Sequence, residues 1–263
     1  MDDEAVELAP LIPDQRRELI LKHLRREQVL SFNQLSALLD VSHMTIRRDV
    51  AALEQEGRAI SVPGGARIAS RLLVEPSHEE KALVDSSEKS AMAAIAAAMV
   101  RDSMTIYLDA GTTMLAMVPL LAHIRDLTVV TNDIAIVNAL IPHPTTELIL
   151  IGGRIDTGNQ SSVGRLAAAM LRELVVDIAF ISTSSWDLRR GLTTPAESKV
   201  EVKQAAVAIS SETVLVGASS KYGTFGKYKA LDLRQFDVIV SDSGLSENTV
   251  AGLTALGVTV KLP

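Results

Sequence analysis

The sequence contains no cysteine and few aromatic residues. Without cysteine, disulfides, thiolate metal sites and cysteine nucleophiles are excluded, and a reducing compartment is compatible with the composition. Aromatic residues make up 3% of the chain and hydrophobic residues 47%, so the expected core is aliphatic. The 263 residues suffice for one large domain or two unequal domains, each with a core of its own.

Long hydrophobic runs are also missing. The longest, residues 91–100, is shorter than the roughly 18 residues that span a bilayer. The opening MDDEAVELAPLIPDQRR places acids where a signal peptide carries positive charge, so we expect a cytoplasmic protein without membrane attachment. The net charge of −6 argues against a general binder of polyanions. The five histidines lack metal-ligand spacing, and no cofactor is expected.

Three short helices are predicted in the first quarter of the chain. Apolar residues recur at helical spacing over residues 13–28. Ser31 and Ser42 are placed to cap a second and a third helix, because a serine hydroxyl can accept from the free N–H groups of a first turn. Gly57 is placed to end the third helix. The second helix carries Leu35, Leu38 and Leu39, and the third helix is expected to bury Ile46, Val50 and Leu53.

A small hairpin is predicted after these helices. Residues 59–62 and 66–68 have strand-like composition, and Pro63-Gly64-Gly65 between them is a turn sequence. Three helices followed by such a hairpin are typical of a winged helix-turn-helix. The second helix of that motif enters the major groove with its N-terminal residues near the bases.

The third helix therefore provides the expected DNA contacts. Its exposed N-terminal edge contains arginines that can donate to guanine, and hydroxyl groups that can reach bases or phosphates. In the alternative interpretation, the two arginines pair with Asp49 or Glu54 on a solvated helix face. The candidate residues are Ser42, His43, Thr45, Arg47 and Arg48.

Apolar strand-like runs alternate with helical stretches in the rest of the chain. This alternation predicts an α/β domain with a mostly parallel, doubly wound sheet. The runs are 105–109, 127–131, 147–151, 178–182, 213–217, 237–241 and 258–262, and the helical stretches lie near 88–101, 113–123, 133–141, 164–174, 196–210 and 246–255. The expected organisation is a tail over 1–12, a winged helix-turn-helix over 13–69, a linker over 70–86 and the α/β domain over 87–263.

Several loops of the α/β domain follow strands and are polar or rich in glycine. Residues 109–113, DAGTT, connect a strand to a helix, where backbone N–H groups can meet an anionic ligand. Asn132, the pair Gly152-Gly153 and Lys221 follow other strands. Because the ends of parallel strands meet at one edge of a sheet, these loops indicate a ligand pocket.

The stretch LLDVSHMTIRRDVAALEQEG, followed by PGGA, resembles the N-terminal domain of the DeoR family of bacterial transcription regulators. The matching positions are Val41, Ser42, Thr45, Ile46, Arg47, Arg48, Asp49, Leu53, Gly57, Gly64, Gly65 and Ala66. Wings of this family often carry an arginine and a histidine before the two glycines, where this chain has Ser61 and Pro63. Wing contacts are therefore expected from Arg58, Arg67 or backbone N–H groups.

The resemblance extends to the α/β domain. The family's effector domain is similar in fold to ribose-5-phosphate isomerase and binds phosphorylated sugars or sugar derivatives. The ligand candidates that the resemblance implies are Asp109, Gly111, Thr112, Thr113, Asn132, Gly152, Gly153, Glu197 and Lys221. Family members commonly carry an aspartate where this chain has Ala218.

The resulting hypothesis is a regulator, expected to repress a sugar or sugar-acid operon, that binds double-stranded operator DNA and responds to a small anionic metabolite. Residues 11–70 carry nine basic and seven acidic residues, so attraction to DNA is weak and a homodimer or homotetramer on paired half-sites is expected. One alternative is an enzyme, a sugar-phosphate isomerase with an accessory DNA module, in which Asp109 or Glu197 is the base. Another is a scaffold whose winged helix contacts proteins.

Overall fold

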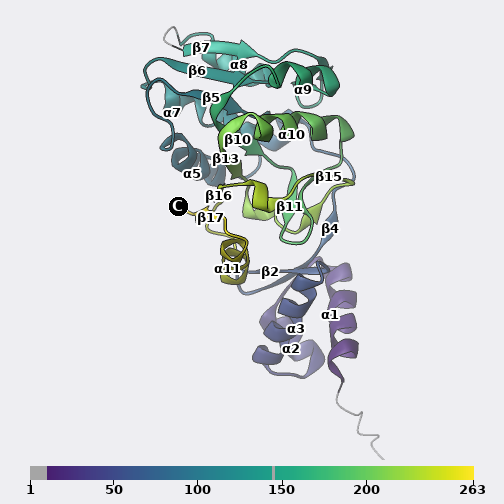
Figure 1. Ribbon diagram of the computed structural model, residues 1–263. Helices are drawn as coiled ribbons and strands as arrows, with labels where there is room; N and C mark the ends of the chain where they lie inside the picture. The colour runs from purple at the N-terminus through teal and green to yellow at the C-terminus, as the bar shows by residue number, and fades with distance from the viewer. Residues whose placement is uncertain (1–10, 144–145) are drawn as a thin grey trace, which may run out of the picture. The chain divides into compact units, whose positions relative to one another are not determined.

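The chain divides after Ala69 into two compact units, Met1–Ala69 and Ser70–Pro263. The structure, a computed structural model, describes residues 11–143 and 146–263. The N-terminal tail expected over residues 1–12 therefore lies, up to residue 10, outside the described residues. Figure 1 shows the elements of both units.

The first unit is a winged helix-turn-helix. Its helices are α1 (Pro13–Glu27), α2 (Phe32–Leu39) and α3 (His43–Gln55). A three-stranded antiparallel sheet has the order β1-β3-β2, with β1 at Val29–Ser31, β2 at Ala59–Val62 and β3 at Gly65–Ile68. The hairpin of β2 and β3 was predicted, whereas the three-residue β1 gives too short a pattern to be recognised.

Local signals place the helix ends of the first unit as predicted. The Ser31 hydroxyl accepts from the Gln34 N–H at 3.1 Å, and the Ser42 hydroxyl accepts from the Thr45 N–H at 3.2 Å. Gly57, after α3, has a φ of 66°, which favours glycine. The first unit thus begins and ends its helices where the sequence indicates.

The core of the first unit is aliphatic. Ile46, Val50 and Leu53 are buried, as predicted, and α1 contributes further buried apolar residues. Leu38 of α2 is 48% exposed. Leu38 lies outside the face of α2 that contacts the core. That face is formed by Phe32, Leu35 and Leu39.

The second unit contains a seven-stranded parallel sheet with the order β17-β16-β13-β10-β5-β6-β7 (Figure 1). All seven predicted runs form its strands. They are β5 (Thr105–Leu108), β6 (Leu127–Thr131), β7 (Thr146–Leu150), β10 (Val176–Ser182), β13 (Ser210–Val216), β16 (Val238–Val240) and β17 (Thr259–Lys261). From β5 the chain adds β6 and β7 on one side and then returns to add β10, β13, β16 and β17 on the other. This is the doubly wound arrangement that the sequence predicts.

Helices cover both faces of this sheet (Figure 1). One face packs against α5 (Ser86–Ala97), α6 (Thr112–Leu115), α7 (Val118–Leu121) and α8 (Ile134–Leu140). On the other side lie α9 (Arg165–Leu171) and α10 (Val200–Ala208). The helix α10 contacts β10 and β13, and α11 (Glu247–Ala255) contacts β17. Alternate residues of one strand, such as Ile178 and Phe180 of β10, enter the first of these cores.

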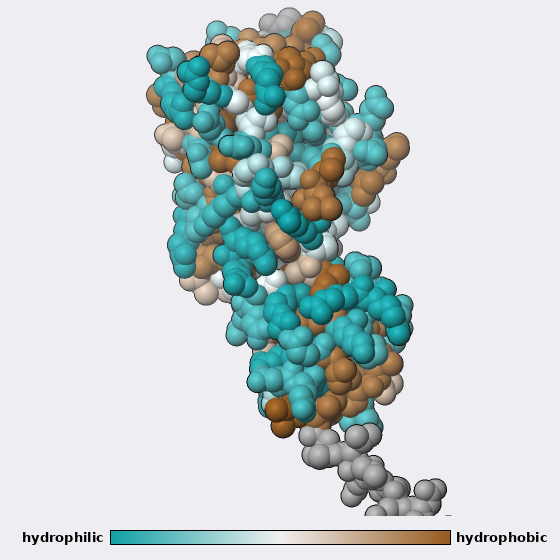
Figure 2. Space-filling view, turned by 90° about the vertical axis from the view of Figure 1, so that its right-hand side faces the viewer, coloured by the Kyte–Doolittle hydropathy of each residue, from teal (hydrophilic) through white to brown (hydrophobic). Residues whose placement is uncertain are grey.

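Short elements surround the main sheet. They are β4 (Ser70–Arg71) with β14 (Thr224–Phe225), β8 (Arg154–Asp156) with β9 (Ser161–Val163), the sheet of β11 (Ser185–Asp187), β12 (Gly191–Thr194) and β15 (Tyr228–Leu231), the helix α4 (His78–Ala82), and the 3-10 helices η1 (Glu197–Lys199), η2 (Ser219–Lys221) and η3 (Leu233–Gln235). The segment 70–86, expected as a linker, contains β4 and α4 and belongs to the second unit. Hydrophilic side chains predominate on the face in Figure 2. Within the described residues, every helix is too short or too polar to cross a bilayer.

Candidate functional site

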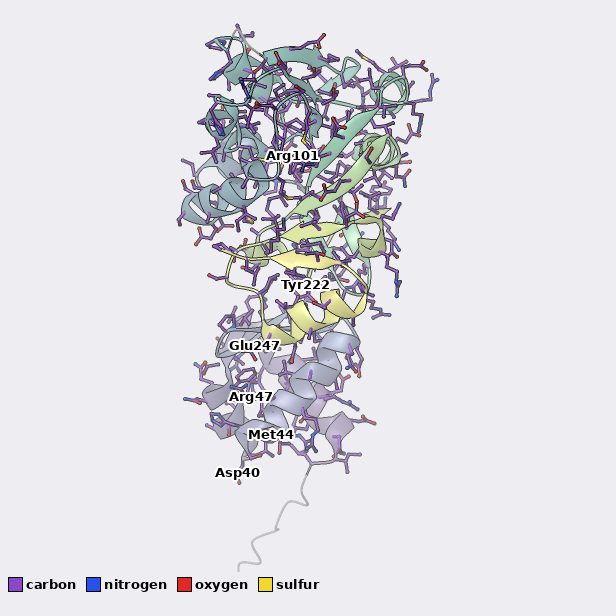
Figure 3. All side chains as sticks on the ribbon, turned by 60° about the vertical axis from the view of Figure 1, so that its left-hand side comes forward. Asp40, Met44, Arg47, Arg101, Tyr222 and Glu247 are labelled. Atoms are coloured by element: carbon purple, nitrogen blue, oxygen red, sulfur yellow. The ribbon has the colours of Figure 1, made fainter. Side chains whose placement is uncertain are left out.

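The N-terminal edge of α3 is exposed in the first unit. Ser42, His43, Arg47 and Arg48 are exposed, and Thr45 is half-buried with its hydroxyl 2.9 Å from that of Ser42. Figure 3 labels Arg47 together with Met44, which precedes it by one helical turn and is 66% exposed. The Arg47 guanidinium carbon lies 4.9 Å from the centre of the Phe32 ring. These residues form a polar, cationic edge beside a capped helix N-terminus.

Neither acid proposed in the alternative interpretation pairs with these arginines. Asp49 forms its ion pair with Arg16 of α1. Glu54 accepts from the Ser61 N–H at 3.1 Å, and burial raises the pKa of its carboxyl group. Among the described residues, Arg47 and Arg48 form no ion pair, so both side chains are available to an external anion.

The two wing candidates lie elsewhere. Arg58 pairs with Glu18 at 2.6 Å and with Glu56 at 3.4 Å, beyond the C-terminal end of α3. With a rise of about 1.5 Å per residue, that end is roughly 20 Å from the N-terminal edge. Arg67 lies in the central strand β3, opposite residues of β1 and β2. The structure therefore does not bring these arginines to the exposed edge of α3.

A recess in the second unit lies where the strand order of the main sheet reverses, between β5 and β10. Asp109 follows β5, and Ser182 ends β10 and donates its N–H to the Asp109 carboxylate at 3.0 Å. Lys203 of α10 forms an ion pair with the same carboxylate. In doubly wound sheets this position is the usual ligand crevice, because loops leave it in opposite directions.

Six of the nine expected ligand residues line the recess. These six are Asp109, Gly111, Thr112, Thr113, Asn132 and Lys221. The other three do not line it. Gly153 has a φ of 149°, and a β-carbon there would lie 3.2 Å from the backbone nitrogen of Ala167 in α9. Glycine at this position therefore allows the chain to pack closely against α9. Gly152 directly precedes it and does not line the recess either. Glu197 is exposed on a separate open groove beside Arg154 and Arg165.

Sequence reasoning missed most of the charge in the recess. Lys81, Lys199 and Lys203 join Lys221, and Glu75 joins Asp109, which gives four lysines against two carboxylates. The three missed lysines lie on α4, η1 and α10, outside the loops that follow strands. Their spacing along the chain carries no signal, because only the fold brings these helices together.

Lys221 carries the least compensated charge of the four lysines. Its ammonium donates to the Thr183 carbonyl at 2.9 Å, and no carboxylate of the described residues lies within ion-pair distance. Burial, together with the neighbouring Lys81 and Lys89, lowers the pKa of Lys221 to about 8. A bound anion would stabilise this ammonium.

Hydroxyl groups of the recess are also available. The Ser161 hydroxyl is buried and has no hydrogen-bond partner within the described residues, which is unusual for a buried polar group. The hydroxyls of Thr112 and Thr113 likewise make no hydrogen bond to any of the described residues. The backbone, in contrast, is partly used, since the Ala110 N–H donates to Asn132 and the Gly111 N–H to Asp133.

The recess thus differs from the expected backbone cradle for an anion. Ammonium and hydroxyl groups provide its unused donors, whereas the first N–H groups of the 109–113 loop are already bonded. Gly111 has a φ of 150°, so glycine is required there by the backbone conformation. No group of potential metal ligands occurs within residues 11–143 and 146–263.

Comparison with known proteins covers both units. Residues 16–71 match the DeoR-like helix-turn-helix domain, and residues 84–243 match the DeoR C-terminal sensor domain. An uncharacterized HTH-type transcriptional regulator of Haemophilus influenzae is 42% identical over 252 residues, or 96% of this chain and 98% of the relative. The putative aga operon transcriptional repressor of Escherichia coli O157:H7 is 32% identical over 250 residues, or 94% of this chain and 93% of the relative.

A structural likeness is weaker. Ribose 5-phosphate isomerase A of Methanocaldococcus jannaschii aligns with a TM-score of 0.39 and 16% identity over 52% of this chain and 55% of the isomerase. The two family models and the full-length relatives, together with the exposed α3 edge and the recess, identify the protein: it belongs to the DeoR family of transcriptional regulators.

Proposed function

We propose that this regulator represses a sugar or sugar-acid catabolic operon and that a phosphorylated sugar or related anionic metabolite releases it from operator DNA. The cationic recess is the observation that carries this proposal. The recess contains four lysines and two carboxylates, and the buried Ser161 hydroxyl has no hydrogen-bond partner among the described residues. A polyhydroxylated anion supplies both a negative charge and hydrogen-bonding groups.

The direction of regulation follows the relatives. The E. coli O157:H7 relative is named a putative repressor of the aga operon, and a 31% identical relative of Agrobacterium fabrum is named a transcriptional repressor. The effector must bind the DNA-competent and incompetent arrangements with unequal affinity, because otherwise it shifts no equilibrium.

On the DNA side, we assign base and phosphate contacts to the N-terminal edge of α3. Arg47 and Arg48 donate to base edges or phosphates, and the Ser42 cap directs the helix N-terminus towards the backbone. The first unit is close to neutral, so we expect two or four copies of the chain on paired half-sites in the cytoplasm.

We assign no catalytic activity to the recess. An isomerase needs a free carboxylate near the proton-bearing carbons of the sugar. The Asp109 carboxylate is held by Lys203 and Ser182, and Glu197 does not line the recess. Turnover of ribose 5-phosphate by the purified protein would contradict this assignment.

The test uses duplex DNA selected from a random library by the purified full-length protein. We expect phosphorylated sugars and sugar acids, added singly, to include at least one that releases the selected DNA in a retardation assay. Lys221→Met is the matched variant, because it should retain DNA binding and lose the response. Binding that no metabolite alters would refute the sensor role.

A further inference from the structure

The segment that follows the first unit in sequence, residues 72–85, is here named the strap. It carries Glu75 and α4, and it begins three residues after Ala69. Its apolar side chains contribute little to its attachment, since Leu73, Val74, Leu83 and Val84 are 72, 77, 87 and 56% exposed. Polar contacts to the rest of the second unit hold the strap instead.

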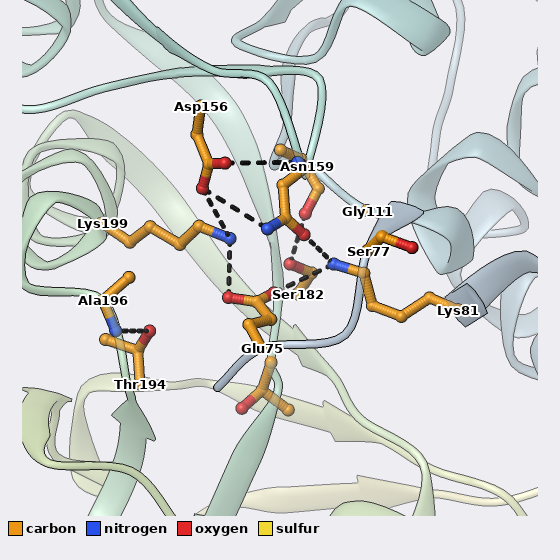
Figure 4. A network of polar contacts seen from close by, with 12 residues as sticks. Glu75, Ser77, Lys81, Gly111, Asp156, Asn159, Ser182, Thr194, Ala196 and Lys199 are labelled. Atoms are coloured by element: carbon orange, nitrogen blue, oxygen red, sulfur yellow. Dashed lines mark hydrogen bonds and ion pairs between the residues drawn. The ribbon is translucent and has the colours of Figure 1, made fainter. Parts of the chain in front are cut away.

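The central contact of the strap is made by Glu75. Its carboxylate lies 2.7 Å from the Lys199 ammonium and 2.9 Å from the Lys81 ammonium, and all three groups line the recess (Figure 4). The three side chains are only 11–14% exposed. Lys81 also donates to Asn159, and Lys199 lies 3.9 Å from Asp156. The strap therefore places an anion of its own between two lysines of the ligand site.

The two ammonium groups also change the pKa of Glu75. Burial alone would raise the pKa of its carboxyl group, but Lys199 and Lys81 outweigh burial and lower it to about 2. For the ammonium group of Lys81, burial has the opposite sign and lowers the pKa. The two ammonium groups share this one buried carboxylate, and a ligand carboxylate or phosphate can take the same position.

We propose that Lys81 and Lys199 form a second anion subsite, which the Glu75 carboxylate occupies in this structure, and that an effector with two anionic ends binds by displacing Glu75. This inference rests on the proposed function, since it concerns the same recess. Displacement leaves Lys81, Lys199 and Lys221 to be compensated, while Asp109 continues to pair with Lys203. A phosphate of charge about −1.5 to −2 at one end and a carboxylate at the other balance three ammonium groups.

The chemical class of the effector follows from this balance. It is a polyol phosphorylated at one end and carrying a carboxylate, or a second phosphate, at the other. Its binding exchanges an intramolecular anion for an external one and so detaches the strap at Glu75. The strap is joined to the first unit through β4, so this exchange changes how the segment that leads to the DNA-binding unit is held.

The test is Glu75→Gln in the full-length protein, with Glu79→Gln as the matched control. Glu79 lies on the same strap and is exposed, so the control makes the same charge change outside the recess. Sulfate is the probe, at constant ionic strength, and unfolding is followed by the fluorescence of Trp186, the single tryptophan. Because an internal competitor reduces apparent affinity, we expect Glu75→Gln to bind sulfate about tenfold or more tightly than the control.

Two further measurements complete this test. The gain in sulfate affinity should vanish when Lys199→Gln is added to Glu75→Gln. In the unsubstituted protein, saturating sulfate should increase hydrogen exchange of residues 72–77, the part of the strap that contains Glu75 and precedes α4. If Glu75→Gln binds sulfate no better than Glu79→Gln, or if it folds only poorly and sulfate fails to restore its stability, the subsite is refuted.

The two-anion class has its own test. Phosphorylated aldonates are compared with the alditol phosphates of the same length, for example 3-phosphoglycerate with glycerol 3-phosphate and 6-phosphogluconate with glucitol 6-phosphate. At least one aldonate should bind more tightly than its partner, and a panel without such a difference overturns the class. If metabolites release DNA but Glu75→Gln gains no sulfate affinity, the subsite fails and the proposed function stands; the reverse pattern refutes the function and retains the subsite.

Discussion

Removing the Asp49 carboxylate should destabilise the first unit and leave the stability of the second unit unchanged. Two guanidinium nitrogens of Arg16 bond the two carboxylate oxygens of Asp49, one of them at 3.1 Å, and thereby join α1 to α3. The side chains are 12% and 5% exposed. Asp49→Ala leaves the Arg16 charge without its partner, which costs about 3 kcal/mol, the lower end for a broken buried pair.

This cost is large for so small a unit. A unit of about 60 residues has a total stability on the order of 3–9 kcal/mol, at roughly 0.05–0.15 kcal/mol per residue. Asp49→Ala should therefore remove a third or more of the stability of the first unit, together with DNA binding. The exposed pair of Arg26 and Glu27 provides the control, because Glu27→Ala should cost at most about 1 kcal/mol.

Two optical signals separate the units in this experiment. Far-ultraviolet circular dichroism follows the helices of both, whereas the fluorescence of Trp186 follows the second unit alone. We expect Asp49→Ala to lower the midpoint of a helical transition and to leave the fluorescence transition unchanged. A double-mutant cycle with Arg16→Ala should give a coupling of about 2 kcal/mol. Additive single effects, or an Asp49→Ala protein as stable as Glu27→Ala, would refute the reasoning.

Three further predictions concern DNA, ligand and wing. Arg47→Ala or Arg48→Ala should cost about 1–3 kcal/mol of operator affinity where the arginine contacts a base, without changing the unfolding midpoint; unchanged retardation of the selected duplex would favour the scaffold. Lys221 loses its proton above its pKa of about 8, so sulfate affinity should fall by up to about tenfold per pH unit above that value, whereas a Lys221→Met protein should show a smaller fall over the same range. A β-carbon on Gly65 would lie 2.4 Å from the Leu30 carbonyl oxygen, so Gly65→Ala should separate β1 from β3 and cost about 1–3 kcal/mol, measured as a lower unfolding midpoint of the first unit.

Local sequence signals allowed the structure of the first unit to be predicted. The starts of α2 and α3 each depend on a serine that accepts from an N–H group three residues later, and the core face of α3 depends on spacing within a single helix. The strands of the main sheet were predictable for a similar reason, since each is a short apolar run and the inner strands are largely buried on both sides. The loop residues that line the recess could be predicted as far as they follow strands, as Asp109 and Thr112 do.

The sequence by itself therefore determined the two units, the strands and the exposed arginines, because those features arise from interactions between near neighbours. Only the tertiary structure decided the charge of the recess. Glu75 meets Lys199 across 124 residues, and neither belongs to a pattern that marks it. Glu197 and Lys199 are two positions apart, yet only the lysine lines the recess, because residues two apart on a helix point to different sides. The packing of that helix on the sheet decides which of its sides faces the recess. This packing depends on residues distant in the chain and is not determined by the local sequence of the helix.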